Sequence, residues 1–156
     1  YVNADTIAQG LSAFAPETAA MEAGRVMLER LKGIAKDGRN FAFETTLATR
    51  FYSKWLRSIQ PQGYNVHLVF LWLSSPELAI ERVAARVRDG GHNIPLETIR
   101  RRYERGLDNF FKLYQPFVDS WEVLDVSEDS PKEVAFGDKI NGWQTTTESI
   151  WKLIQR

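Results

Sequence analysis

The residues best suited to chemistry are four closely spaced arginines, Arg100–Arg102 and Arg105. Guanidinium groups present forked donors that match phosphate oxygens, so such a cluster is typical of a site that binds phosphorylated molecules. At about 100° per residue, Arg101, Arg102 and Arg105 fall with Asn109 along one flank of the apolar stripe of a helix. The residues of this stripe are Ile99, Tyr103, Leu107, Phe110, Tyr114 and Phe117. A side chain on such a flank can reach into a neighbouring cleft.

The same arginines have a simpler interpretation as surface charges. Arg100 precedes Glu104 by four residues, and Arg105 precedes Asp108 by three. Ion pairs at these spacings on a helix surface contribute about 0.2–0.5 kcal/mol each. The arginine residues alone leave both interpretations open.

The segment that carries these arginines, residues 86–107, has the shape expected of a lid. Gly90 and Gly91 are typical of a helix end, because glycine adopts positive φ readily. Pro95 is typical of the start of the next helix. The connection between the two helices carries His92, for which contact with phosphate or substrate and a purely loop-forming role stay equally open. The pattern predicts two helices joined by a short exposed connection.

Acidic and hydroxyl side chains follow two predicted strands, residues 1–5 and 40–46. In parallel α/β sheets, ligands bind at the carboxyl ends of the strands, so one edge of the sheet should gather these side chains. Polar residues also stand at strand ends simply because the chain meets water there. The polar residues concerned are Asn3, Asp5, Glu44, Thr45 and Thr46.

These groups together form a coherent set for phosphoryl transfer, a reaction that depends on positioning and charge neutralisation. In this hypothesis Asp5 is the base, Glu44 holds or orients Mg²⁺ and its waters, and arginines between Arg86 and Arg105 clamp the phosphates. The phosphate cradle G-x-x-x-x-G-K-[ST] does not occur in the sequence. The nearest imitation, residues 33–40, lies where a helix leads into a strand, which is the reverse of the required context.

The elements that must position these groups alternate between helices and strands, which predicts a three-layer α/β fold with a parallel sheet. The apolar run of residues 65–73 is typical of a strand buried on both faces, and Trp72, Trp121 and Trp151 fall at apolar positions that predict core packing. The other expected elements are helices at 16–36, 51–59, from 75 onward and 143–154, and strands at 122–127 and, more briefly, 133–136.

Composition narrows the functional classes. The 156 residues suit one domain, residues 1–156, and the 20 basic and 20 acidic side chains leave no net positive charge to hold a nucleic acid nonspecifically. No cysteine is present, so thiolate metal sites and disulfides are excluded. The longest apolar run, residues 68–73, is too short to span a bilayer. A soluble, cytoplasmic protein is expected, and the opening at Tyr1 suggests a segment upstream.

Several of these segments together resemble the zeta toxin family, and in particular its bacterial branch described as predicted ABC-type or AAA-family ATPases. The resemblance extends in order over nearly the whole chain. The segments that carry it are Tyr1–Asp5, Phe43–Thr46, Phe70–Leu73, Arg86–Val87, Gly90–His92 and Ile99–Tyr103.

This resemblance implies a P-loop kinase fold with an arginine-rich helical lid. Zeta toxins phosphorylate a hydroxyl of UDP-N-acetylglucosamine with ATP and Mg²⁺, and an epsilon antitoxin protein neutralises them. The family's catalytic aspartate matches Asp5, and its Glu-Thr pattern at the substrate and metal site matches Glu44 and Thr45. Its lid arginines correspond to Arg86 and to the group at residues 100–105.

The sequence departs from the family in two places. The first strand and the P-loop, a unit of roughly 30 residues, are absent, so these 156 residues by themselves are not expected to bind ATP productively. The family branch also tends to carry Asp-Asn-Ser where this chain has Asp125-Val126-Ser127. The contacts that this segment makes to a nucleotide or substrate are therefore open.

Three functions follow as hypotheses. The first is an ATP-dependent kinase that acts on a sugar nucleotide or a similar small molecule. The second keeps the kinase fold and changes the acceptor to a polynucleotide end or another metabolite, a version that the neutral charge disfavours. The third is a truncated, non-catalytic relative that binds a partner protein through an exposed sheet edge or groove.

Overall fold

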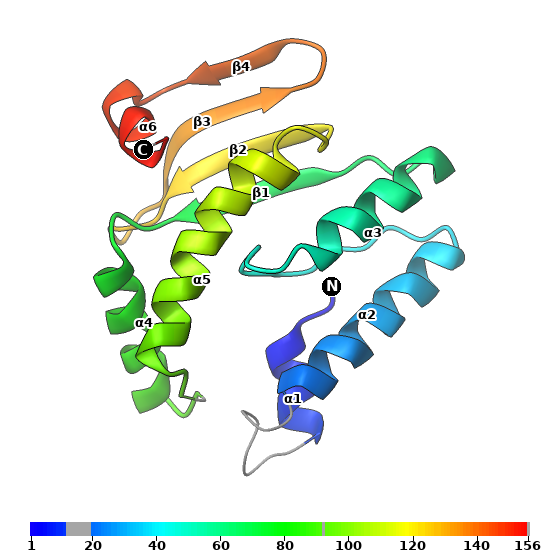
Figure 1. Cartoon of the computed structure of the whole chain (residues 1–156), viewed down its shortest axis with the longest axis horizontal. Helices are drawn as coiled ribbons and strands as arrows, with labels where there is room; N and C mark the ends of the chain where they lie inside the picture. The colour runs from blue at the N-terminus through cyan, green and yellow to red at the C-terminus, as the bar shows by residue number, and fades with distance from the viewer. Residues whose placement is uncertain (12–19, 92, 156) are drawn as a thin grey trace. The chain divides into compact units, whose positions relative to one another are not determined.

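A computed structural model describes residues 1–11, 20–91 and 93–155, without the side chains of residues 5, 9, 20 and 21 (Figure 1). The helices are α1 (Ala4–Leu11), α2 (Ala20–Lys36), α3 (Phe51–Ile59), α4 (Pro76–Arg88), α5 (Leu96–Asn109) and α6 (Glu148–Ile154). The strands are β1 (His67–Trp72), β2 (Ser120–Asp125), β3 (Lys132–Asp138) and β4 (Gly142–Thr145). A short 3₁₀-helix η1 (Gln60–Gln62) follows α3, and a π-helical turn η2 (Phe110–Tyr114) continues α5.

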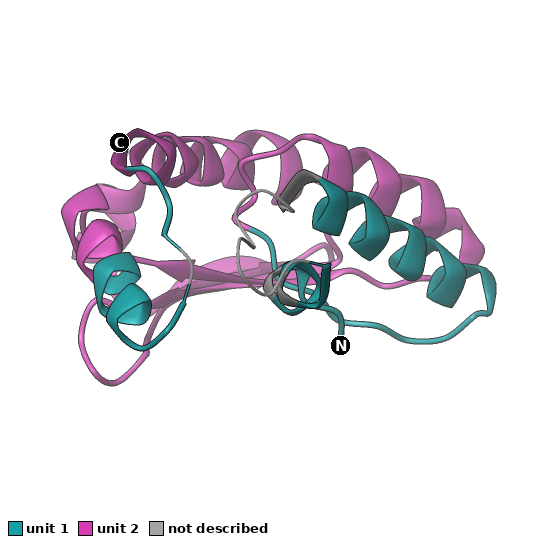
Figure 2. Ribbon diagram, turned by 90° about the horizontal axis from the view of Figure 1, so that it is seen from below, with its two compact units in different colours: residues 1–45, 82–95 teal, residues 46–81, 96–156 magenta. Residues whose placement is uncertain are grey.

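Two compact units make up the chain (Figure 2). Unit 1 comprises residues 1–45 and 82–95, and unit 2 comprises residues 46–81 and 96–156. The whole sheet belongs to unit 2, together with α3, α5 and α6. Among the residues that the structure describes, no helix has the length and apolar character needed to cross a membrane.

The sheet of unit 2 is mixed, with the strand order β1-β2-β3-β4. β1 and β2 run parallel, from the pair His67 and Ser120 to the pair Trp72 and Asp125. β3 and β4 are antiparallel additions. The fold is α/β as expected, but the prediction of a wholly parallel sheet is wrong. The connections that lead into β3 and β4 are too short to be crossovers, so they can join only antiparallel neighbours.

The segment expected to form a helix from residue 143 begins instead with β4, and the helix α6 starts only at Glu148. A tight turn explains the difference. Asp138 accepts hydrogen bonds from the N–H groups of Ile140 and Asn141 through Oδ1, each at 2.7 Å. Gly142 then adopts a φ of 78°, which reverses the chain into a hairpin.

An aromatic cluster packs against one face of this sheet. Phe110 of η2 is 0% exposed; its ring stacks on Phe70 at 4.7 Å and meets Trp121 edge-on at 5.7 Å. Trp151 of α6 stacks on Trp121 at 5.6 Å. The expected core role of these tryptophans is confirmed. Burying such rings contributes the largest apolar areas of the unit.

The opposite face of β1 is more open. Val69 is 44% exposed and Leu71 is 59% exposed, while Trp72 is 4% exposed. The prediction that residues 65–73 are buried on both faces is therefore wrong. β1 is one of the two edge strands of the sheet of unit 2, the other being β4, and its side chains alternate in exposure as those of a half-buried strand do.

In unit 1, α1 packs against α2. The described side chains of this pair that are buried are Ala8, Ala23, Met27, Leu31 and Ala35. The two strands expected at residues 1–5 and 40–46 reduce to one parallel bridge between Val2 and Phe43. The N–H of Val2 donates to the carbonyl of Ala42 at 2.9 Å. The two segments thus run side by side in the expected direction, but over a shorter length.

Candidate functional site

Asn3 and Glu44 meet in unit 1. Asn3 Nδ2 donates to Glu44 Oε2 at 3.2 Å and lies 3.2 Å from the hydroxyl of Tyr1. The bridge between Val2 and Phe43 stands directly before both residues and fixes this proximity. The structure thus brings together two of the residues expected at the edge of the sheet.

Asp5 does not end a strand, because α1 begins at Ala4. Asn3 caps this helix: its Oδ1 accepts the backbone N–H of Thr6 at 3.2 Å. An asparagine followed by an aspartate in the first turn is a helix-start signature, and this local signal prevailed over the strand propensity of Tyr1 and Val2. The side chain of Asp5 lies outside the described part of the structure.

A Mg²⁺ ion at Glu44 would need water and phosphate as its other ligands. Mg²⁺ in phosphoryl-transfer sites commonly takes one or two carboxylates and keeps several waters. Glu44 is exposed and offers one carboxylate, and the half-buried Thr45 follows it. Within residues 1–11, 20–91 and 93–155, no group of three histidine, cysteine or acidic residues is placed to hold a metal ion. An all-protein cage therefore does not occur in this part.

The segment predicted to be a lid has the expected form of two helices joined by a connection. α4 ends at Arg88, α5 begins at Leu96, and Gly90 adopts a φ of 92°. The N–H of Gly91 donates to the carbonyl of Arg86 at 2.9 Å. A Cβ atom at Gly91 would stand 2.8 Å from Arg86 Cγ, so only glycine fits this helix end. Arg86 is exposed, and His92 lies outside the described residues.

The apolar stripe predicted for the second lid helix is confirmed, and it runs on into η2 and the turn after it. Ile99 is 7% exposed, Tyr114 is 1% exposed and Phe117 is 6% exposed. Because this stripe faces the core, the flank beside it lies at the rim of the buried surface. That flank carries Arg102 and Asn109.

The arginines of α5 fall into two classes. Arg100 lies 3.4 Å from Glu77 of α4 and 3.9 Å from Glu97, so the surface interpretation holds for Arg100. Its partners are not the expected Glu104, however, and Asp108 pairs with Lys112 instead of Arg105. Tertiary proximity to α4 decided the first of these pairings.

The remaining arginines are not held by acidic side chains. Arg101 Nη2 donates to Thr98 Oγ1 at 3.4 Å. Arg102 and Arg105 are exposed, and they form no ion pair or hydrogen bond with the other described residues. Both guanidinium groups are thus available to bind an anion.

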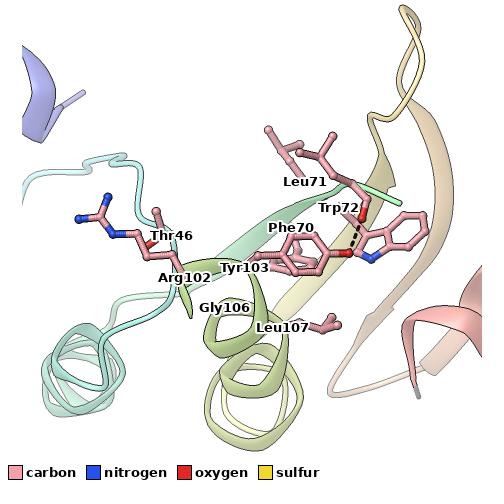
Figure 3. A pocket seen from close by; sticks show the side chains of 9 residues that line it. Thr46, Phe70, Leu71, Trp72, Arg102, Tyr103, Gly106 and Leu107 are labelled. Atoms are coloured by element: carbon pink, nitrogen blue, oxygen red, sulfur yellow. Dashed lines mark hydrogen bonds between the residues drawn. The ribbon is translucent and has the colours of Figure 1, made fainter. Parts of the chain in front are cut away.

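Arg102 lines a pocket between α5 and the end of β1, with a cavity volume of about 100 Å³ (Figure 3). Tyr103 closes part of it by donating its hydroxyl to the carbonyl of Leu73 at 2.7 Å. Burial raises the pKa of the Tyr103 phenol above its usual value, so the phenol stays protonated. The residues that line the pocket are Thr46, Phe70–Leu73, Arg102, Tyr103, Gly106 and Leu107.

Thr46 enters this pocket two residues after Glu44. The lining therefore includes a threonine, an arginine and an apolar wall, and the guanidinium of Arg102 is directed away from that wall (Figure 3). From the sequence, Tyr103 was predicted only to be part of the apolar stripe. The one signal for Gly106 was the presence of a glycine inside a helix, which is unusual.

The site residues divide between the units. Asn3, Glu44 and Arg86 belong to unit 1. Thr46 and the arginines at 100–105 belong to unit 2. The predicted crevice between the acidic residues and the lid arginines stays a prediction.

A family model described as "Zeta toxin" matches residues 5–136 of the chain. A protein from Haemophilus influenzae (strain ATCC 51907 / DSM 11121 / KW20 / Rd) is 28% identical over 102 residues, which cover 65% of this chain and 73% of that protein. Its printed name, "Uncharacterized protein", states no activity. No solved structure matches the chain significantly.

Proposed function

Because the chain belongs to the zeta toxin family, whose members are kinase-like phosphotransferases, we propose that it transfers the γ-phosphate of ATP to a hydroxyl group of a small molecule. The proposed acceptor is a sugar nucleotide such as UDP-N-acetylglucosamine, or a similar compound. One observation carries the proposal: Thr46, two residues after Glu44, lines the same pocket as the unpaired Arg102.

The proposed reaction forms one bond and breaks one. The oxygen of the acceptor hydroxyl attacks the γ-phosphorus, the bond from that phosphorus to the bridging oxygen breaks, and ADP leaves. Asp5 accepts the proton of the attacking hydroxyl. Negative charge spreads over the transferred group during this step, so guanidinium groups that face it lower the barrier.

The remaining residues bind and orient the reactants. Arg102 and Arg105 balance the charge on the transferred group, and Arg86, Arg101 and His92 bind nucleotide phosphates. Asn3, Thr45 and Thr46 hydrogen-bond the acceptor.

Glu44 holds Mg²⁺, directly or through water, while Asn3 fixes the orientation of its carboxylate. A Mg²⁺ ion held there would supply positive charge that neutralises the phosphate oxygens.

Members of this family typically pair with an antitoxin, so we propose an antitoxin protein as a partner and the cytoplasm as the place where both act. The alternative acceptor is a polynucleotide end or another small molecule, to which the γ-phosphate would be transferred by the same reaction.

A partner-binding role without catalysis is supported by a different observation. Val69 and Leu71 are exposed on the edge strand β1, and an apolar sheet edge favours pairing with another chain.

The test uses the full-length product of the gene, because the 156 residues contain no P-loop sequence. The purified protein is incubated with Mg²⁺, γ-³²P-labelled ATP and separate acceptors: UDP-N-acetylglucosamine, other sugar nucleotides, free sugars and oligonucleotides. We expect label in a sugar nucleotide. Label in an oligonucleotide alone would identify the other acceptor class, and no transfer to any acceptor would favour the partner-binding role.

Arg102→Ala and Arg100→Ala form a matched pair, because both arginines are exposed side chains of the same helix, α5. Arg102 lines the pocket, whereas Arg100 pairs with Glu77 on the surface. Removing one charge-stabilising donor from a phosphoryl-transfer site lowers the rate by about 10²-fold or more. We expect that loss for Arg102→Ala and less than about a twofold change for Arg100→Ala. Equal losses in both variants would refute the role of Arg102.

A further inference from the structure

A conformationally strained turn stands directly before α3. Leu47 has a φ of 55°, a left-handed conformation that side chains other than glycine and asparagine rarely adopt. Leu47 is also 3% exposed, so the turn is packed into the core of unit 2. Such a conformation persists only where surrounding contacts hold it.

Contacts from α5 and η2 hold this turn. Asn109, itself 6% exposed, donates from Nδ2 to the carbonyl of Leu47 at 2.7 Å. Tyr114 donates its hydroxyl to the carbonyl of Thr49 at 3.2 Å. A Cβ atom at Gly106 would stand 2.5 Å from the carbonyl oxygen of Thr46, so the turn lies directly against the helix.

The same face of α5 carries both the clamp and the pocket arginine. Arg102, Gly106 and Asn109 are separated by four and three residues, the spacing of neighbours along one helix face. Gly106 and Arg102 both line the pocket, together with Thr46. The position of the turn on the helix therefore sets where Thr46 stands relative to the guanidinium of Arg102.

We infer that Asn109 is a positioning residue for the phosphoryl acceptor: by holding the left-handed turn at Leu47, it fixes Thr46 beside Arg102 in the pocket. This inference rests on the proposed function. A buried carboxamide that only stabilised the fold could donate to any carbonyl in the core. Asn109 donates to the carbonyl of Leu47, the residue in the left-handed conformation that directly follows the pocket residue Thr46.

The test compares two carboxamides in the full-length protein. Asn109→Leu keeps the branched size and removes the donor to the turn. Gln60→Met is the control, because Gln60 Nε2 donates to the backbone carbonyl of Phe117 at 3.1 Å and to Asp119 Oδ2 at 2.9 Å, both in unit 2, and Gln60 does not line the pocket. Melting temperatures and steady-state kinetics with Mg²⁺, ATP and UDP-N-acetylglucosamine are measured for both variants.

We expect Asn109→Leu to lower kcat/KM for the acceptor about tenfold or more while leaving the KM for ATP unchanged. Gln60→Met should lower the melting temperature by a similar amount and keep kcat/KM for the acceptor. If kcat/KM for the acceptor fell in both variants in proportion to the fall in melting temperature, the inference would be overturned and Asn109 would be a structural residue.

A second readout separates this inference from the proposed function. Inorganic phosphate is titrated into wild type and Asn109→Leu, and the methyl NMR signal of Thr46 is followed. A weaker affinity in the variant supports the positioning role even if wild type transfers no phosphate to any acceptor, a result that would refute only the proposed function. Equal affinities, or no phosphate-dependent shift in wild type, would overturn the inference.

Discussion

Gly106→Ala is expected to destabilise the protein, although the same change inside most helices is stabilising. Alanine normally gains about 1 kcal/mol over glycine in a helix interior. At Gly106 the new Cβ atom would stand 2.5 Å from the carbonyl oxygen of Thr46. Real Cβ atoms do not approach so closely, so the turn must move away from α5.

The size of the effect follows from what that movement breaks. The hydrogen bond from Asn109 to the carbonyl of Leu47 is 2.7 Å long and buried, and an unsatisfied buried polar group costs about 1–3 kcal/mol. Overpacking adds about 1–3 kcal/mol. After the helix gain of about 1 kcal/mol is subtracted, the net loss is about 1–5 kcal/mol. For a chain of this length that corresponds to about 2–20 °C in melting temperature.

Urea and thermal unfolding followed by circular dichroism measure this change. Gly24→Ala is the matched control, because Gly24 lies inside α2 and a Cβ atom there meets nothing within 4 Å. We expect Gly24→Ala to stabilise by about 0.5–1 kcal/mol. If Gly106→Ala were as stable as wild type or more so, the turn would not be clamped against α5, and the positioning of Thr46 by that helix would be refuted.

Two further predictions concern stability. Burial disfavours ionisation of Asp119, but hydrogen bonds from Lys139, the N–H of Val66 and Gln60 outweigh it and lower its pKa. The ionised carboxylate therefore stabilises the folded protein at pH values above the usual pKa of 3.8, and this stabilisation is lost as the pH falls through the lower pKa of the folded state. Asp119→Asn should therefore melt lower than wild type at pH 7 and lose less stability on acidification, as melting temperatures between pH 7 and 2 will show; parallel curves would contradict this. Phe110→Ala, at a 0% exposed position, should lower the free energy of unfolding in urea by about 3–5 kcal/mol. Phe51→Ala, at a 48% exposed position, should lower it by less than about 1 kcal/mol. Similar losses in both variants would refute the aromatic core.

Local signals allowed the end of α4 and the start of α5 to be predicted well. Gly90 and Pro95 mark the end of α4 and the start of α5 through their own backbone preferences. The apolar stripe of α5 follows from helical periodicity. The same periodicity placed Asn109 beside the arginines, but it could not show that its partner would be the carbonyl of Leu47, which is 62 residues away in sequence.

Predictions failed where tertiary contacts or competing local signals decided the outcome. Arg100 has an acidic residue four positions later, yet its guanidinium pairs with Glu77 of α4 and with Glu97. The apolar composition of β1 predicted burial on both faces, but burial depends on what packs against a strand. Tyr1 and Val2 favoured a strand, and the cap formed by Asn3 started a helix instead.

The central claim is that the protein transfers phosphate from ATP to a small-molecule hydroxyl. The most direct measurement is ³¹P NMR of a reaction with Mg²⁺, ATP and UDP-N-acetylglucosamine, in which ADP and any phosphorylated acceptor are counted together. We predict one phosphorylated acceptor for each ADP formed. ADP accompanied only by inorganic phosphate, or no ADP above that of the protein-free control, would contradict the claim.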